Sequence, residues 1–185
     1  MSGCIAALAL ACSQPAWAAP ESYKVDPDHT IPGFEVTHLG LSSVRGLFQK
    51  AAGKITLDRA AKTGTIEIVI DTASVVTNVD RRDKLIRDWF KTDQFPNMVY
   101  RSNNLKFSGD DVVGADGELT MLGITRPVTL TVTRFNCIVH PVNKRQLCGA
   151  DGTALIKRSE FGMTFLSNVI GEDVKILFGI ETIKE

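Results

Sequence analysis

The chain has 185 residues, and its 21 basic and 21 acidic side chains give no formal net charge at pH 7. Proteins that bind nucleic acids usually carry a basic excess or a basic stripe, so this balance argues against nucleic acid as a partner. No segment after residue 18 has the 18 or more consecutive apolar residues that are typical of a membrane-spanning helix.

The first 18 residues have the composition of a secretory signal peptide. The apolar run over residues 4–12 is too short to span a bilayer, and Ala16-Trp17-Ala18 is a small-x-small cleavage site. We therefore expect cleavage after Ala18 and a periplasmic domain made of residues 19–185, a usual length for one domain. Lipidation of Cys12 is the alternative, but the residues before it match such a site poorly.

Most of the remaining chain alternates apolar and polar residues, as half-buried β-strands do. In the first alternating segment, residues 29–38, one face carries Phe34, Val36 and His38. The same alternation recurs in residues 44–57, 65–71, 97–108, 118–122, 126–135 and 173–183. About eight antiparallel strands with no long helix between them predict an up-and-down barrel with room for one small ligand, or else a β-sandwich. We favour the barrel.

Residues 74–96 interrupt this strand pattern. Within them, four apolar residues recur at the three- and four-residue spacing of an amphipathic helix: Leu85, Ile86, Trp89 and Phe90. A short helix in an all-β protein must bury its apolar side against something. We therefore expect residues 81–91 to form a short helix that caps the mouth of the barrel as a lid, with a helix that merely plugs the fold as the alternative.

Few polar residues are arranged for catalysis or metal binding. His29, His38 and His140 lack the spacing of a zinc site, and no serine lies in a nucleophile elbow. His38 is expected either as a hydrogen-bonded core residue or as a polar contact to a ligand head group. Arg82 and Asp83 most simply fix the start of the helix, and an anion clamp or an acid/base pair is the alternative.

Two cysteines remain after cleavage of the signal peptide. Cys137 and Cys148 flank a polar, turn-rich stretch, so in an exported protein they predict a disulfide that closes a hairpin. A loop of this length would be stabilised by roughly 2 to 3 kcal/mol. A reduced metal-binding pair is the less favoured alternative, because only His140 lies between them and a structural site needs four ligands.

Motifs along the whole of residues 19–185 match one known family. They are Tyr23-Lys24-Val25-Asp26 with His29, the alternating Phe34, Val36, His38 and Gly40, Gly46-Leu47-Phe48, residues 72–78 followed by Arg82-Asp83, Gly117-Glu118-Leu119-Thr120, residues 123–128, and Glu160-Phe161-Gly162-Met163. These motifs resemble the YceI-like family of periplasmic, lipocalin-like polyisoprenoid-binding proteins. The resemblance covers residues 23 to about 184.

The resemblance implies an all-β, extended antiparallel barrel of about eight strands, with a helix over its mouth and an apolar tunnel for a lipophilic chain. It implies neither catalysis nor a cofactor, and it suggests a membrane cytochrome of the b561 type as a partner and a homodimer as the oligomeric state. The chain departs from the family pattern at the lid, where Leu85 and Ile86 stand in place of His-Leu and the following segment is shorter. The cysteine hairpin is also not general to the family.

We therefore expect a periplasmic carrier or sequestering protein that holds a polyisoprenoid, a quinone or a similar amphiphile in the barrel. The predicted ligand-binding residues are Phe34, Val36, His38, Phe48, Arg82, Asp83, Leu85, Ile86, Trp89, Phe90, Phe161, Met163 and Phe178. One alternative is a scaffold or stress-response interaction protein with a filled core. Another is an enzyme that acts on a bound lipid through His38 with Arg82 or Asp83.

Overall fold

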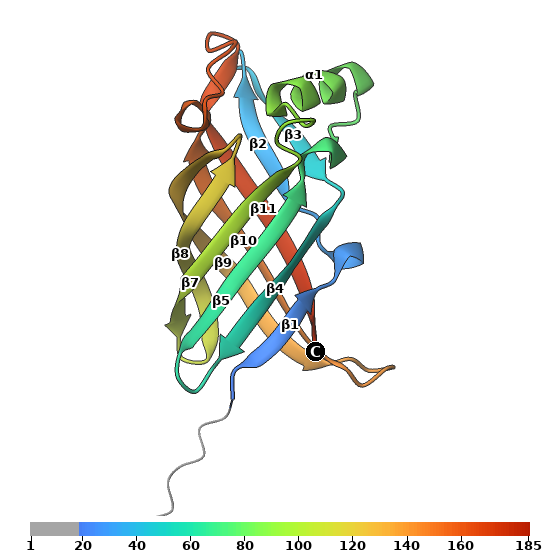
Figure 1. The fold of residues 1–185 in the computed structure, drawn as a ribbon, viewed down its shortest axis with the longest axis vertical. Helices are drawn as coiled ribbons and strands as arrows, with labels where there is room; N and C mark the ends of the chain where they lie inside the picture. Colours follow the sequence, from blue (N-terminus) through green and yellow to red (C-terminus); the bar gives the residue numbers. More distant parts are fainter. Residues whose placement is uncertain (1–18) are drawn as a thin grey trace, which may run out of the picture.

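The computed structural model describes residues 19–185, and the predicted signal peptide, residues 1–18, lies outside the described residues. Strands dominate the fold, with one α-helix at one end (Figure 1). The strands are β1 (Glu21–Val25), β2 (Gly33–His38), β3 (Ser42–Phe48), β4 (Ala51–Asp58), β5 (Thr63–Asp71), β6 (Val75–Val76), β7 (Asn97–Ser108), β8 (Asp111–Met121), β9 (Ile124–Val139), β10 (Gln146–Lys157) and β11 (Ile170–Lys184). The helices are α1 (Asp80–Phe90) and three 3-10 turns, η1 (Pro27–His29), η2 (Thr72–Ser74) and η3 (Arg158–Phe161).

All the strands belong to one antiparallel sheet that closes on itself between β1 and β11, where Tyr23 lies opposite Lys184. Three strand positions are each occupied by two successive segments. β1 and β2 share the first position, because both pair with β11. β4 pairs with β1 and β3 pairs with β2, so β3 and β4 share the second position. β5 and β6 share the third, where β6 follows β5 after η2 and pairs with β3. The eleven segments therefore make the eight positions of a closed barrel, and the predicted fold class is confirmed.

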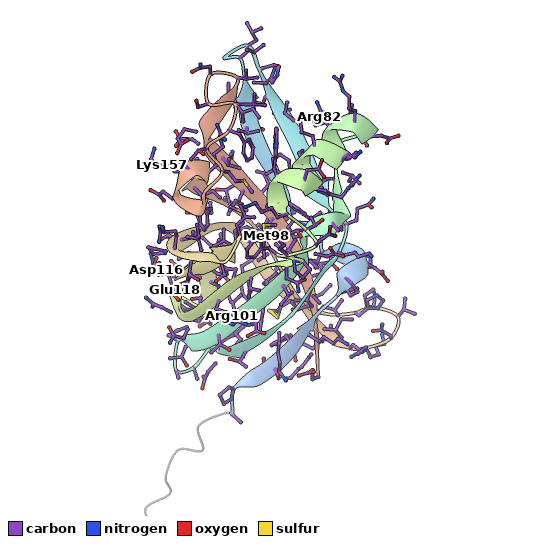
Figure 2. The ribbon with its side chains drawn as sticks, turned by 45° about the horizontal axis from the view of Figure 1, so that its top comes forward. Arg82, Met98, Arg101, Asp116, Glu118 and Lys157 are labelled. Atoms are coloured by element: carbon purple, nitrogen blue, oxygen red, sulfur yellow. A yellow bond between two sulfur atoms is a disulfide. The ribbon has the colours of Figure 1, made fainter. Side chains whose placement is uncertain are left out.

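The alternation of the sequence becomes the inside and outside of this barrel. On β5, Ile66, Ile68 and Ile70 face the interior, whereas Glu67 lies outside and accepts a hydrogen bond from Arg101 at 2.9 Å. Figure 2 shows the same division: Met98 lies within the barrel, and Arg101, Asp116, Glu118 and Lys157 lie on its outer surface. Successive side chains point to opposite faces of a strand, so this part of the fold is a local property of the sequence.

Gly46 leaves room for an aromatic ring of the neighbouring strand close to the backbone of β3. It pairs with Phe34 on β2, and a Cβ atom at position 46 would collide with the ring of Phe34 and approach Thr77. Because glycine has no side chain, Phe34 can cover the strand and still face the interior. The glycine at position 46 thus permits a close approach of a side chain to the backbone of β3.

α1 lies over the upper end of the barrel (Figure 1). Ile86 and Phe90 on its inner face are buried, and Phe90 packs edge to face on Phe48 of β3 with ring centroids 5.8 Å apart. The helix ends where Lys91 takes the left-handed conformation, with φ of 47°. The predicted short helix at the barrel mouth is confirmed. No helix within residues 19–185 is long and apolar enough to cross a membrane.

Candidate functional site

The barrel encloses a cavity of about 920 Å³. Its wall consists mainly of inward-facing aliphatic and aromatic side chains, and it extends from α1 at the upper end down to Tyr23, Leu57 and Leu105. These two regions correspond to two groups of buried apolar residues, one around Phe48 and one around Tyr23. An apolar cavity of this size suits a lipophilic ligand better than a polar one.

The cavity reaches the surface beside α1. Val79, Leu85 and Leu166 line the cavity and are also nearly half exposed, so they mark its mouth. Next to them, Trp89 of α1 packs on Phe165 of the loop after η3, with ring centroids 4.3 Å apart and planes tilted by 32°. The aromatic pair therefore covers part of the opening, and the aliphatic side chains border the rest.

Arg158 holds the loop that carries Phe165. Its guanidinium is buried and donates hydrogen bonds to the carbonyl oxygens of Met163 at 2.6 Å, Phe165 at 2.8 Å, Gly171 at 3.0 Å and Ile170 at 3.2 Å. A buried cation needs such partners, since an unsatisfied one would be strongly destabilising. The loop is thus tied back over the mouth at several points.

Most of the predicted ligand-binding residues lie around this one cavity. Eleven of the thirteen line it: Phe34, Val36, His38, Phe48, Arg82, Leu85, Ile86, Trp89, Phe90, Met163 and Phe178. The other two, Asp83 and Phe161, are buried outside its lining, Phe161 within the upper group of core residues. Contact of any of these residues with a ligand remains a prediction.

Arg82 and Asp83 are both bound to Thr77. The buried carboxylate of Asp83 accepts hydrogen bonds from the backbone N–H of Thr77, at 2.7 Å, and from its hydroxyl. Nε of Arg82 donates to Oγ1 of Thr77 and Nη2 donates to its carbonyl oxygen, each at 2.8 Å. This network ties the first turn of α1 to the end of β6, which is the simpler of the two roles that the sequence suggested.

The charged residues along the cavity gather at the mouth. Arg81, Arg82, Lys84 and Asp88 of α1 line this region together with the buried Arg158, whereas the walls below are mainly apolar. Among residues 19–185, no three His, Cys, Asp or Glu side chains come together in a way that could hold a metal ion. The site is therefore a hydrophobic container with a partly cationic rim.

Comparison with known families identifies the chain. A model of the YceI-like domain matches residues 23–182, which is nearly all of the described barrel. The chain belongs to the YceI-like family. Over 173 residues, this YceI-like protein is 28% identical to Protein YceI of Escherichia coli (strain UMN026) and 30% identical to a UPF0312 protein of Pseudomonas aeruginosa (strain LESB58). Each alignment covers 91% of this chain and 90% of the relative.

Solved structures share the fold of this YceI-like protein. Burkholderia cenocepacia BcnA superposes with a TM-score of 0.71 at 21% sequence identity, covering 85% of this chain and 98% of that one. A polyisoprenoid binding domain from Saccharophagus degradans, implicated in plant cell wall breakdown, superposes with a TM-score of 0.65 at 18% identity, covering 89% and 99%. At such identities the similarity establishes the barrel and its helix, and no more.

The lid of this YceI-like protein is apolar where α1 meets the mouth. Leu85 is partly exposed at the mouth and Ile86 is buried beneath the helix. The mouth therefore presents aliphatic carbon at this point of the rim.

Two tyrosines in the wall were not among the predicted site residues. The hydroxyl of Tyr100 lies 3.2 Å from the carbonyl oxygen of Ala115 and 3.1 Å from that of Val128, and burial raises its pKa to about 12. The hydroxyl of Tyr23 donates to Glu21 at 2.6 Å, and burial likewise raises the pKa of Tyr23. Both hydroxyl groups are used by the protein itself, so the rings add to the apolar wall. Their inward positions in alternating segments were the signal that could have revealed them.

The lower part of the wall includes the predicted disulfide. Cys137 and Cys148 are bonded and lie at opposite positions of β9 and β10, with Cα atoms 4.1 Å apart. Cys148 lines the cavity, and its carbonyl oxygen accepts a hydrogen bond from Oγ1 of Thr182 at 2.8 Å. The predicted pairing is confirmed, and it joins β9 and β10 in the lower wall of the cavity.

Proposed function

We propose that this protein binds one lipophilic chain, such as a polyisoprenoid or a quinone, inside its barrel and acts as a carrier or sequestering protein. The observation that supports this most strongly is the apolar cavity of about 920 Å³ that opens beside α1. The shared fold of a polyisoprenoid binding domain supports the same class of ligand.

Hydrophobic burial supplies the main favourable contribution to binding. Burying roughly eight to ten methylene-sized units at about 0.8 kcal/mol each contributes roughly 6 to 8 kcal/mol before the entropic cost of binding is subtracted. A charged site deep in the barrel is therefore not required. Selectivity would then depend on the length and width of the chain, and on the groups at the mouth.

The polar groups around the cavity agree better with binding than with catalysis. The enzymatic alternative needs His38 to act with Arg82 or Asp83 on a bound lipid, but Asp83 lies outside the cavity lining and both partners are engaged by Thr77. The scaffold alternative needs a filled core, which the large cavity argues against. Neither alternative has an observation in its favour.

A periplasmic location is part of the proposal. A cleaved signal peptide over residues 1–18 would export the barrel domain, residues 19–185, and the Cys137–Cys148 disulfide suits an oxidising compartment. A membrane cytochrome of the b561 type and a homodimer are carried over from the family resemblance and stay predictions.

The direct test is to identify what the native protein carries. Protein purified from its own periplasm is extracted with organic solvent, the extract is analysed by mass spectrometry, and the emptied protein is titrated with polyprenols, quinones and fatty amides. We expect a lipophilic chain near one per protein molecule. If the extract is empty and none of these compounds binds, the proposal is wrong.

A further inference from the structure

Exposed aliphatic side chains gather around the mouth of the cavity. Leu39 and Leu41 flank the turn between β2 and β3, Val79 and Leu85 lie at α1, and Leu166 lies in the loop after η3. Leu41 is 83% exposed. Figure 1 shows α1, the β2–β3 turn and the loop before β11 at the same end of the barrel, away from the C-terminus. We call these five residues the rim leucines and valine.

Contacts between the three segments bring these side chains to one surface. The backbone N–H of Leu39 donates to the carbonyl oxygen of Val169 at 2.7 Å, which joins the β2–β3 turn to the loop. The Trp89–Phe165 pair joins the same loop to α1. Since Val79, Leu85 and Leu166 also line the cavity, the exposed apolar surface is continuous with its interior.

The charge of this surface comes from α1, whose 4 basic and 3 acidic side chains leave one net positive charge. Residues 36–44 and 161–171 contain no Asp, Glu, Lys or Arg. On α1, Arg81 and Lys84 are exposed at the mouth, and Asp80 and Asp88 are the exposed acids of the helix. Exposed apolar side chains with cations beside them are the pattern of a surface that enters the boundary of an anionic bilayer.

We propose that the mouth of the barrel docks on an anionic lipid bilayer. The rim leucines and valine insert between the acyl chains, and Arg81 and Lys84 face the lipid phosphates. The inference rests on the proposed function, because a docked mouth would let a lipophilic chain pass between membrane and cavity without crossing water. A protein partner or a second copy of the chain would instead have to match several separate protruding leucines around an open cavity.

The test uses residues 19–185, within which the barrel is complete, and vesicles of phosphatidylcholine with or without phosphatidylglycerol. Co-sedimentation should be stronger with phosphatidylglycerol and should weaken as salt rises, because salt screens exposed charges. Combining Leu39→Asp with Leu41→Asp should reduce vesicle binding about tenfold or more, because moving one leucine side chain from water into an apolar environment favours the bound state by about that factor. Lys84→Gln should reduce it about fivefold, the effect of one cation at an anionic surface.

A matched control lies at the other end of the barrel. Val139 and Val142 project from the β9–β10 hairpin, and Val142 is 82% exposed, nearly the same fraction as Leu41. The pair Val139→Asp and Val142→Asp should leave vesicle binding unchanged. Leu39 and Leu41 do not line the cavity, so their substitution should also leave the binding of a soluble lipophilic probe unchanged.

The outcomes separate docking from ligand binding. The inference is overturned if the protein does not bind vesicles, or if the leucine pair and the valine pair of substitutions reduce vesicle binding equally. It is also overturned if the protein dimerises without vesicles and the leucine substitutions abolish that dimer. A protein that binds the lipophilic probe and ignores vesicles loses this inference but keeps the proposed function. A protein that docks and binds no lipophile keeps the docking surface but loses the proposed function.

Discussion

Replacing Asp83 with alanine tests whether this residue anchors the lid or serves the ligand. The substitution removes the acceptor of two hydrogen bonds, from the N–H and the hydroxyl of Thr77, in a site where Asp83 is only 6% exposed. Hydrogen bonds to a charged group contribute about 1.5 to 3 kcal/mol each, and a buried N–H left without a partner costs about 1 to 3 kcal/mol. These overlapping effects lead us to expect a loss of about 3 kcal/mol in the free energy of unfolding.

The assay is urea unfolding of Asp83→Ala beside Asp88→Ala, which removes an exposed carboxylate from the same helix. We expect Asp88→Ala to change the free energy of unfolding by less than about 0.5 kcal/mol. Under conditions where both variants are folded, their affinity for a lipophilic probe should stay near that of the wild type. The anchoring role of Asp83 would be refuted if Asp83→Ala lowered the free energy of unfolding by less than about 1 kcal/mol. It would also be refuted if the variant kept normal stability but lost its affinity for the lipophilic probe.

Three further predictions concern the disulfide, the tyrosines and the mouth. Reduction of the Cys137–Cys148 bond should lower the free energy of unfolding by about 3 kcal/mol in urea titrations with and without reductant, and an unchanged midpoint would contradict this. Burial raises the pKa of Tyr100 to about 12 and also raises that of Tyr23, the two tyrosines of the chain, so the folded protein should show no phenolate absorbance near the ordinary pKa of about 10. Because folding raises the pKa of both tyrosines, the stability that these residues contribute is present below pH 10 and is lost as the pH rises toward their pKa values in the folded protein. Phenolate absorbance that appears near pH 10 in the folded protein would count against the burial of the two hydroxyl groups. Trp89→Ala should speed ligand release about two- to tenfold in stopped-flow measurements, because it removes an aromatic pair over the opening, and an unaltered rate would show that the pair is no gate.

Local patterns in the sequence were enough to predict most of the strands, the helix and the disulfide, but not β1, and the strand expected over residues 29–38 begins only at Gly33. The inward set of Ile66, Ile68 and Ile70 follows from the two-residue period of a strand. The helix expected over residues 81–91 is observed over Asp80–Phe90. For the strands and the helix the signal lies within a few neighbouring residues, and the two cysteines are separated by 11 positions across one hairpin, so no knowledge of distant contacts was needed.

Closure of the barrel and the division of its interior could not be predicted in this way. The pairing of Tyr23 with Lys184 joins opposite ends of the domain, and no local period records it. Arg158 begins η3 directly after β10 and would ordinarily be expected at the surface, but the following loop folds back and supplies its carbonyl partners. Phe161 and Met163 are both apolar and close in sequence, yet Met163 lines the cavity and Phe161 packs outside its lining.

The central claim is that a lipophilic chain occupies the cavity, and a titration with a cavity-blocking variant tests it most directly. Ala150 lines the cavity from β10, whereas Leu155 on the same strand is 67% exposed and does not line it. Ala150→Trp places an indole ring inside the barrel, and Leu155→Trp places one outside. We expect a long-chain polyprenol or quinone to bind the wild type and Leu155→Trp at one molecule per protein and to bind folded Ala150→Trp at least about tenfold more weakly. Equal binding by all three proteins, or binding by none, would contradict the account.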